Sequence, residues 1–146
     1  MSLRVVNYKK RLHRQAHKEP LARMKEMQKL RFVWFALVPD YGEYYGDVKR
    51  IYKPTRTLRL LDLSTMHDRM VIALELGEPI KSLDPEDQYS AGTSTNYLMH
   101  SLLEPLLLKY NLDGTIIEDA RADEECQGPT EVVLRGSSVR HIQRVF

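Results

Sequence analysis

The sequence predicts a single mixed α+β domain with about six strands and three helices. Short runs rich in β-branched and aromatic residues alternate with longer segments in which apolar residues recur at helical spacing. Pro, Gly, Asn and Asp residues separate these segments, and no internal repeat or low-complexity tract interrupts them. A chain of 146 residues has the size of one domain and can bury a core. The mixture of both element types is typical of an α+β fold.

The expected strands are short and rich in Val, Ile, Tyr, Phe and Thr, the residues that favour β-structure. Pro54 separates two of them. The segments are 32–38, 48–52, 57–63, 115–117, 130–134 and 139–145. Residues 3–12 mix apolar and basic side chains and are a candidate first strand.

Two of the expected helices have clear start signals, and the second also has a clear stop signal. The first follows Pro20, which suits the first turn of a helix, and its apolar residues continue to Leu30. The second begins at Ser64 or Thr65, either of which can cap the first turn. Gly77 then ends it, because glycine readily adopts the left-handed conformation that follows a helix.

The third expected helix, residues 96–110, has the strongest pattern. Its leucines fall along one side of the helix, and Pro105 predicts a kink or a break. These leucines are Leu98, Leu102, Leu106 and Leu107. Before this helix, residues 78–95 contain two prolines, a glycine and many polar residues, which predicts a long surface loop.

Charge is distributed unevenly along the chain. The net charge is +2, but the first 31 residues carry ten Lys or Arg against only Glu19 and Glu26, so the remainder is acidic by six. Such a basic segment can bind phosphate, a nucleic acid or an acidic partner. The alternative is a solvated helix face with a frayed terminus. No aromatic residue except Tyr8 interrupts the early basic run, which argues against stacking on single-stranded bases.

Several classes of protein are excluded or disfavoured. No apolar stretch approaches the ~20 residues that a membrane helix needs, and the segment after Met1 does not have the pattern of a signal peptide. The single Cys126 cannot form an internal disulfide, so we expect a cytoplasmic protein. Glycine-rich phosphate loops, dinucleotide fingerprints and serine nucleophile elbows are absent. His13 and His17 have the i, i+4 spacing of a helical metal site, but their basic surroundings favour surface histidines over zinc ligands.

The most informative segment is the strand-like run 32–38 and the turn that follows it. Pro39 and Asp40 break the run, and three tyrosines then fall within five residues beside two glycines. A buried strand does not need such a turn, whereas a flat heteroaromatic ligand can stack on it. The segment suggests a nucleotide or nicotinamide pocket, although a tyrosine-rich turn can also simply close the edge of a core.

A candidate acid, Glu131, opens the strongly apolar run 130–134. A carboxylate at the start of such a strand can face a cleft, bind a sugar hydroxyl and stabilise positive charge at an anomeric carbon. This is the electrostatic requirement of glycosidic-bond cleavage. The alternative is that Glu131 marks the solvated start of an edge strand, and the physics of the sequence alone favours that alternative.

The order of these motifs resembles the ADP-ribosyltransferase fold, in particular its diphtheria-toxin and poly-ADP-ribose polymerase branch with small relatives in phages and large DNA viruses. Val33-Trp34-Phe35-Ala36 resembles the second-strand motif of that family, with Trp34 where the family usually has Tyr. Tyr45, or Tyr44 beside it, resembles the nicotinamide-stacking ring. The run that begins at Thr130-Glu131 resembles the glutamate strand. The resemblance implies split, mostly antiparallel sheets.

The resemblance also implies a chemistry. NAD is the expected substrate and lies in a cleft between the two halves of the split sheet, its nicotinamide held between Tyr45 and either Tyr44 or Trp34. Glu131 is the expected catalytic residue, and ADP-ribose passes to an acceptor, which is a protein, a nucleic acid, a small molecule or water. The expected NAD-binding residues are His13, Arg14, Trp34, Phe35, Ala36, Tyr44 and Tyr45.

Two departures from the family pattern keep other functions open. The family's first motif pairs His or Arg with Gly, but Leu12-His13-Arg14 contains no glycine, and Trp34 replaces a tyrosine. These departures favour a member of the fold that has lost catalysis and only binds a nucleotide or a partner. The basic first 31 residues favour a third hypothesis, a nucleic-acid-associated protein without enzymatic activity.

Overall fold

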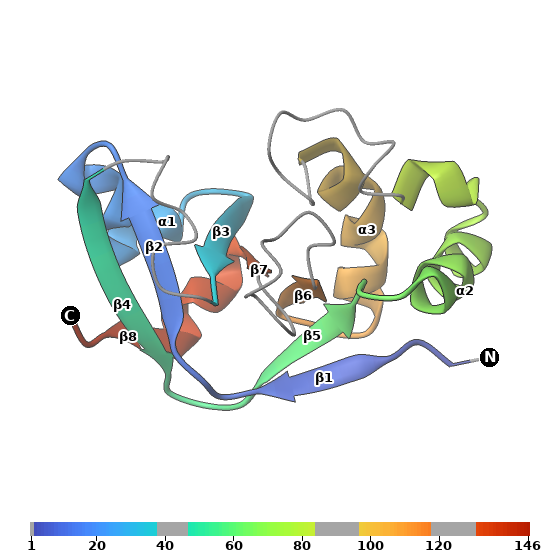
Figure 1. Ribbon diagram of the computed structural model, residues 1–146, viewed down its shortest axis with the longest axis horizontal. Helices are drawn as coiled ribbons and strands as arrows, with labels where there is room; N and C mark the ends of the chain where they lie inside the picture. Colours follow the sequence, from blue (N-terminus) through green and yellow to red (C-terminus); the bar gives the residue numbers. More distant parts are fainter. Residues whose placement is uncertain (1, 38–46, 84–96, 118–130) are drawn as a thin grey trace, which may run out of the picture.

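A computed structural model of the chain describes residues 2–37, 47–83, 97–117 and 131–146. It contains both helices and strands, as predicted, and its strands form one curled sheet across the molecule (Figure 1). The strands are β1 (Val5–Tyr8), β2 (Leu12–Ala16), β3 (Phe32–Ala36), β4 (Val48–Pro54), β5 (Leu58–Asp62), β6 (Gly114–Ile117), β7 (Glu131–Arg135) and β8 (Ile142–Arg144).

The sheet is continuous, with the strand order β1-β5-β6-β7-β3-β2-β4-β8. Among the described strands only β5 and β6 pair in parallel, so the sheet is mostly antiparallel, as expected. The expectation of separate, split sheets is wrong, because hydrogen bonds link all eight strands. The link between β2 and β3 is nevertheless narrow: it consists of one register pair, His13 with Ala36. In contrast, β3 and β7 share five pairs.

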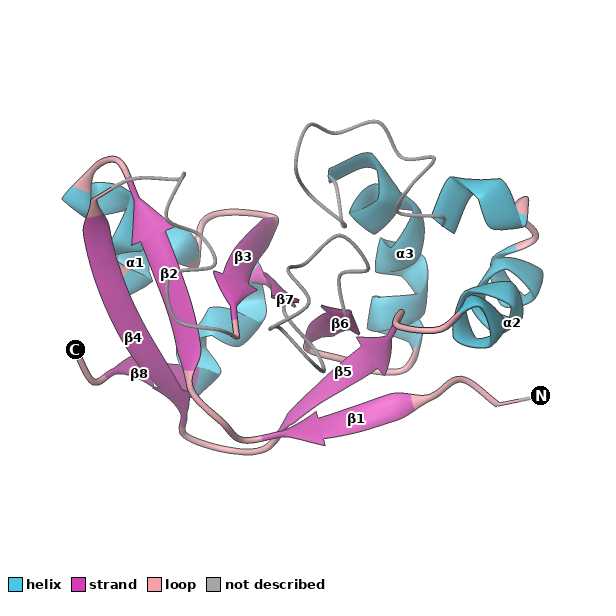
Figure 2. Ribbon diagram, viewed as in Figure 1, coloured by secondary structure: helices cyan, strands magenta, loops and turns pink. Residues whose placement is uncertain are grey.

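Helices lie at opposite ends of the molecule (Figure 2). At one end α2 (Met66–Leu76), the 3-10 helix η3 (Ile80–Leu83) and α3 (Tyr97–Lys109) lie near β5 and β6. At the other end the 3-10 helix η1 (Glu19–Ala22) and α1 (Met24–Met27) lie near β2 and β4. A further 3-10 helix, η4 (Gly136–His141), connects β7 to β8.

The two later helices agree with their sequence signals. The side chain of Thr65 accepts a hydrogen bond from the backbone N–H of Asp68 and so caps α2, and Gly77 ends this helix with φ 69°. Helix α3 continues through Pro105. Asn111, with φ 51°, lies just beyond its end, and asparagine tolerates the left-handed conformation better than most residues.

Three expected elements differ from the structure. The single helix expected after Pro20 is a short 3-10 helix followed by one α-helical turn. The candidate strand 3–12 is two strands, β1 and β2, and the second continues to Ala16. The closing strand expected at 139–145 consists of η4 followed by the three-residue β8.

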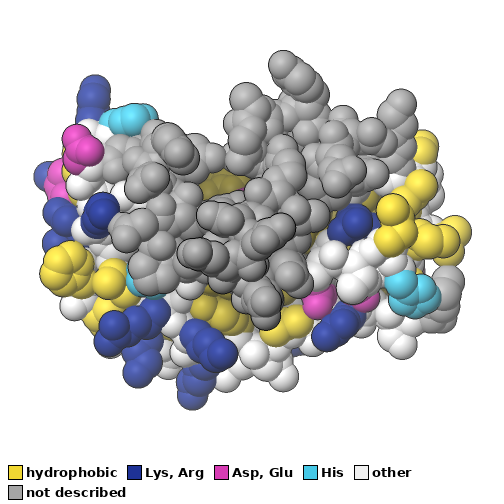
Figure 3. Space-filling view, in the orientation of Figure 1, with side chains coloured by type: hydrophobic (Ala, Val, Ile, Leu, Met, Phe, Trp, Pro, Cys, Tyr) yellow, Lys and Arg dark blue, Asp and Glu magenta, His cyan; other side chains and the backbone are white. Residues whose placement is uncertain are grey.

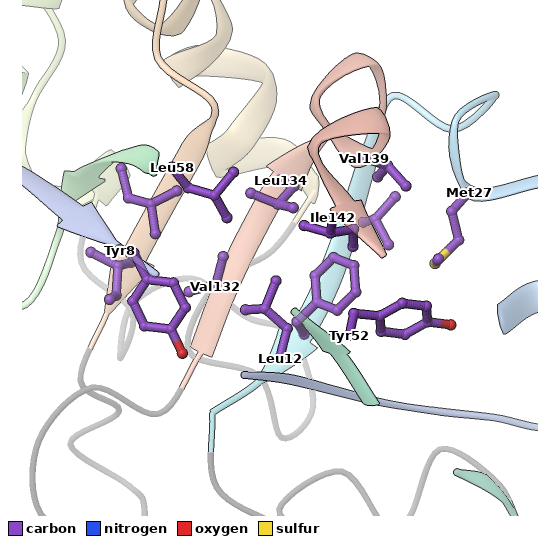
Figure 4. Packing of buried hydrophobic residues seen from close by; sticks show 13 residues of the cluster. Tyr8, Leu12, Met27, Tyr52, Leu58, Val132, Leu134, Val139 and Ile142 are labelled. Atoms are coloured by element: carbon purple, nitrogen blue, oxygen red, sulfur yellow. The ribbon is translucent and has the colours of Figure 1, made fainter. Parts of the chain in front are cut away.

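Two hydrophobic clusters cover opposite faces of the sheet. On one face Val132 and Leu134 of β7 pack against residues that include Phe35 and Tyr52, and η4 closes this cluster with Val139 (Figure 4). On the other face Val133 packs with Phe32 and the buried side of α3. Because successive residues of a strand point to opposite faces, this alternation assigns every residue of β3 and β7 to one face or the other.

Gly114 permits β6 and β7 to pair closely. A Cβ atom at this position would lie 1.9 Å from the carbonyl oxygen of Val133, far inside van der Waals contact. Any side chain there would force β6 away from β7. The central pair of strands therefore requires a glycine at residue 114.

Candidate functional site

Glu131 begins a central strand. Strand β7 pairs with β3 on one side and with β6 on the other, so it is not an edge strand. Glu131 is only 7% exposed to solvent. The alternative of a solvated carboxylate at the start of an edge strand is therefore wrong. A carboxylate is rarely buried to this extent unless a partner or a function compensates for its desolvation.

Glu131 belongs to a row of four residues that crosses the middle of the sheet. His13 of β2 pairs with Ala36 of β3, Ala36 pairs with Glu131, and Glu131 pairs with Ile117 of β6. Paired residues of antiparallel strands lie on the same face, about 4.8 Å apart from strand to strand. His13 and Ala36 are half-buried, so this row runs from the partly open β2 to the covered β6.

A cluster with two aromatic side chains lies beside this row, two residues further along β3 and β7. Trp34 pairs with Val133 and therefore lies on the same face as Glu131, diagonally across β3. The centre of its ring lies 5.8 Å from that of His100 on α3 and 6.4 Å from that of Phe32, both in edge-to-face contacts. We refer to Trp34, His100 and Thr115 as the Trp34 wall.

A buried hydrogen bond fixes the far end of the Trp34 wall. His100 Nε2 and Thr115 Oγ1 are 2.7 Å apart, and both residues are fully buried. Thr115 pairs with Val133, which places it diagonally across β6 from Glu131. Glu131 thus lies between two diagonal neighbours of the same face, Trp34 and Thr115, which are joined through His100.

Arg14 and Phe35, two of the expected NAD-binding residues, lie on the other face of the sheet. Phe35 is 2% exposed within the cluster that contains Val132. The guanidinium carbon of Arg14 lies 6.0 Å from the centre of the Phe35 ring, and burial lowers the pKa of Arg14. Its Nη1 donates a hydrogen bond of 2.9 Å to the backbone carbonyl of Trp34. Arg14 can therefore position the Trp34 backbone from the face of the sheet opposite to Glu131.

The other expected residues divide into two groups. His13, Trp34, Ala36 and Glu131 share one face, and the register brings them together. Tyr44 and Tyr45, the expected stacking rings, lie outside the described residues. The proposed sandwich around nicotinamide therefore remains a prediction from the sequence.

The sequence did not identify His100 and Thr115. A weak signal for His100 is present, because it precedes Leu103 and Leu107 at spacings of three and seven on the buried side of α3. A polar residue in such an apolar stripe needs a hydrogen-bond partner in the core. Which strand residue supplies that partner depends on tertiary packing.

The spacing of His13 and His17 does not form a helical metal site, because His13 belongs to strand β2. Within the described ranges, no group of three or more His, Cys, Asp or Glu side chains could hold a metal ion. In the same part of the chain, no helix is long and apolar enough to cross a membrane.

A hollow of about 340 Å³ opens elsewhere, between α1, α3 and η4. It contains none of the residues of the Glu131 row. Its lining residues are Gln28, Leu30, Arg31, Glu104, Leu108, Arg135, Gly136 and Ser137. Arg31 donates two hydrogen bonds to Glu104, at 2.7 Å and 3.0 Å, so these two charges are paired with each other. The register of the strands identifies a more specific site than this hollow does.

Comparisons of the chain with protein-family models, with curated proteins and with solved structures find no match.

Proposed function

We propose that this protein binds NAD and transfers its ADP-ribose to an acceptor by cleaving the bond between nicotinamide and ribose. The observation that carries the proposal is the position of Glu131. It is a buried carboxylate on a central strand, next to Ala36 and diagonally across from Trp34. Those residues belong to the motifs whose order resembles the ADP-ribosyltransferase fold.

Glu131 has the chemistry that this reaction needs. When the bond between ribose C1′ and the nicotinamide nitrogen breaks, its electron pair moves onto the pyridinium ring, and positive charge develops on the ribose. A nearby carboxylate stabilises that charge and accepts a hydrogen bond from a ribose hydroxyl. Because Glu131 is buried, its field acts through a medium of lower dielectric than water, which strengthens this stabilisation. The acceptor then bonds to C1′ and loses a proton.

Trp34, the half-buried member of the Trp34 wall, lies on the same face as Glu131. We infer that the nicotinamide ring stacks against Trp34 together with Tyr45 or Tyr44, and that His13 contacts a ribose from β2. Aromatic stacking of this kind is worth about 0.5–1.5 kcal/mol beyond the area that is buried. Arg14 and Phe35 lie on the opposite face and do not contact NAD in this proposal.

The alternative is a member of the same fold that binds a nucleotide without cleaving it. The tryptophan at residue 34 and the missing glycine beside His13 favour this alternative. Both functions predict that NAD raises the melting temperature and changes the fluorescence of Trp34, the one tryptophan of the chain. Only turnover distinguishes them.

The deciding experiment measures nicotinamide release from NAD by the wild type, by Glu131→Gln and by Glu75→Gln. The last variant is the matched control, since Glu75 is a surface acid on α2 whose Oε1 binds Lys109 and Tyr110. We expect release by the wild type and by the control, and a loss of about a hundredfold or more in Glu131→Gln. NAD binding without release by the wild type would favour the nucleotide-binding alternative, and a fully active Glu131→Gln would refute the role of Glu131.

A further inference from the structure

Of the ten cations in residues 1–31, four interact with described residues and the other six are available to bind another molecule. Arg4 pairs with Asp62, Lys29 with Glu26, and Arg31 with Glu104. Arg14 is half-buried on the face of the sheet opposite to Glu131, where it donates a hydrogen bond to the Trp34 carbonyl. The other six are exposed and form no ion pair with any described residue. They are Lys9, Lys10, Arg11, Lys18, Arg23 and Lys25. The segment consists mainly of β1, β2 and short helical turns, so the idea of one solvated helix face is wrong.

Three of the available cations are consecutive in the sequence, and buried residues hold the backbone on both sides of them. Lys9, Lys10 and Arg11 form the link from β1 to β2, and the residues at both ends of this link, Tyr8 and Leu12, are buried. The Tyr8 hydroxyl donates a hydrogen bond of 2.7 Å to the carbonyl of Arg11. Burial raises the pKa of Tyr8 further above the neutral range, in which an ordinary tyrosine is already protonated. The backbone of the link is thus held in place before any partner binds, which lowers the entropic cost of binding.

Strand β4 adds a fourth cation. The pairing of Leu12 with Tyr52 places Lys53 beside Arg11 on the neighbouring strand. Lys53 is exposed and forms no ion pair with any residue in the described ranges. Lys and Arg side chains gather over this lower end of β4 and the link between β1 and β2 (Figure 3). We call Lys9, Lys10, Arg11 and Lys53 the basic link surface.

The composition of the basic link surface favours a nucleic acid over an acidic protein. Protein interfaces obtain most of their affinity from aromatic or apolar anchors that become buried at their centre. None of the exposed large apolar side chains among the described residues lies on the link or belongs to the part of β4 beside it. Nucleic acids, in contrast, gain affinity from phosphate contacts alone, since each neutralised phosphate releases counterions.

We propose that the basic link surface binds the phosphodiester backbone of a nucleic acid. Arg11 of this surface is two residues before His13 in the sequence. His13 is the partly exposed end of the row of paired residues that leads to Glu131. Two strand spacings of about 4.8 Å separate His13 from Glu131 along this row. A nucleic acid bound to the basic link surface therefore lies close to Glu131, and we propose that it is also the acceptor of ADP-ribose. This second role rests on the proposed function: a nitrogen or oxygen of the nucleic acid bonds to ribose C1′ and loses a proton, and nicotinamide leaves.

Two triple variants with the same change in composition test the binding. Lys9→Ala/Lys10→Ala/Arg11→Ala alters the basic link surface. Lys18→Ala/Arg23→Ala/Lys25→Ala, the control, removes two lysines and one arginine from the region of η1 and α1, where Glu19 follows Lys18 and Glu26 follows Lys25. Fluorescence anisotropy with a labelled single-stranded oligonucleotide and with its duplex, between about 50 and 200 mM salt, gives the affinity and its salt dependence.

We expect the first triple variant to bind at least about tenfold more weakly, with a slope of log K against log salt that is smaller by about two to three. The control variant is expected to stay within about twofold of the wild type. Equal weakening of both variants, or no binding by the wild type, would overturn the proposal. Binding of poly-glutamate as tight as that of DNA would overturn it in favour of an acidic protein partner.

The two proposals can fail separately. The anisotropy measurement contains no NAD, so its result does not depend on whether the protein cleaves NAD. Conversely, nicotinamide release by the wild type without any nucleic acid tests Glu131 and not the basic link surface. The acceptor role is tested by incubating the wild type with labelled NAD and an oligonucleotide, and it is refuted if label enters none of the nucleic acid while nicotinamide is released.

Discussion

Asp113 and Glu131 are buried carboxylates at opposite ends of the ladder between β6 and β7, and their surroundings differ. Asp113 accepts hydrogen bonds from two nitrogens of Arg56 at 3.1 Å and 2.9 Å, from the Arg59 backbone N–H at 2.8 Å, and from the Ser138 hydroxyl at 2.9 Å. Glu131 has apolar cross-strand neighbours, Ala36 and Ile117. The donors around Asp113 link β5, β6 and η4, so this carboxylate serves the fold, whereas the proposed function of Glu131 is to act on a ligand.

The largest expected effect is on catalysis. If Glu131 stabilises positive charge on the ribose, Glu131→Gln raises the barrier by about 2.7–4 kcal/mol, because the amide keeps the shape and loses the charge. Thermal melting should be nearly unchanged, and nicotinamide release should fall. A fall in melting temperature as large as the one expected for Asp113 would show that Glu131 also serves the fold, and the distinction between the two acids would fail.

The next effect is on stability. Asp113→Asn removes the charge and turns an amide N–H₂ toward the donors of Arg56 and Arg59, so we expect the free energy of unfolding to fall by about 3 kcal/mol. For a chain of this size the melting temperature should drop by about 6–12 °C. Asp47→Asn, at an exposed position, is the matched control and should change little. Equal melting of both variants would contradict the structural role of Asp113.

A smaller effect is expected at the Trp34 wall. Thr115→Val leaves His100 without its hydroxyl partner in a buried site, which should cost about 1–3 kcal/mol. Since Trp34 is the only tryptophan and contacts His100, the emission of the protein should change as well. Thr57→Val, at an exposed position, provides the control. Unchanged emission in Thr115→Val would mean that the hydrogen bond does not position Trp34.

The smallest effect is a dependence of stability on pH. Burial alone would raise the pKa of Asp113, but the Arg59 N–H, the Arg56 guanidinium and the Ser138 hydroxyl outweigh burial and lower it. A carboxyl whose pKa is lower in the folded state stabilises the fold above its ordinary pKa of about 3.9, and this contribution disappears as pH falls through the lower folded value. Denaturation curves below about pH 4 should therefore depend less on pH in Asp113→Asn than in the wild type. Identical pH dependence would exclude this linkage.

The sequence predicted those elements whose signals are local. The cap at Thr65 and the stop at Gly77 lie within one turn of the helix they delimit, so α2 agrees with its prediction. Strand β2 was only partly anticipated, because its middle residues are polar and it is held in place by pairing with β4 rather than by its own composition. The short α1 is a similar case, since packing rather than periodicity decides where it ends.

The sequence suggested His13, Trp34, Ala36 and Glu131 as site residues, but it showed neither their arrangement nor His100 and Thr115. The apolar run after Glu131 is buried on both faces, which is typical of a central strand, but the order of strands in a sheet is set by contacts that are distant in the sequence. For the same reason the sequence did not show that Arg14 and Phe35 lie on the face of the sheet opposite to Glu131. Only the register shows that His13, Ala36 and Glu131 form one row.

The pairing of Ala36 with Glu131 also has a consequence for how the protein folds. Ala36 at the end of β3 and Glu131 at the start of β7 lie far apart in the sequence, so their pairing closes a very long loop. Such contacts form slowly compared with hairpins and helices. During synthesis, β3 must wait for β7 to emerge before the middle of the sheet can close. Until then one edge of β3 is unpaired and open to aggregation or to a chaperone.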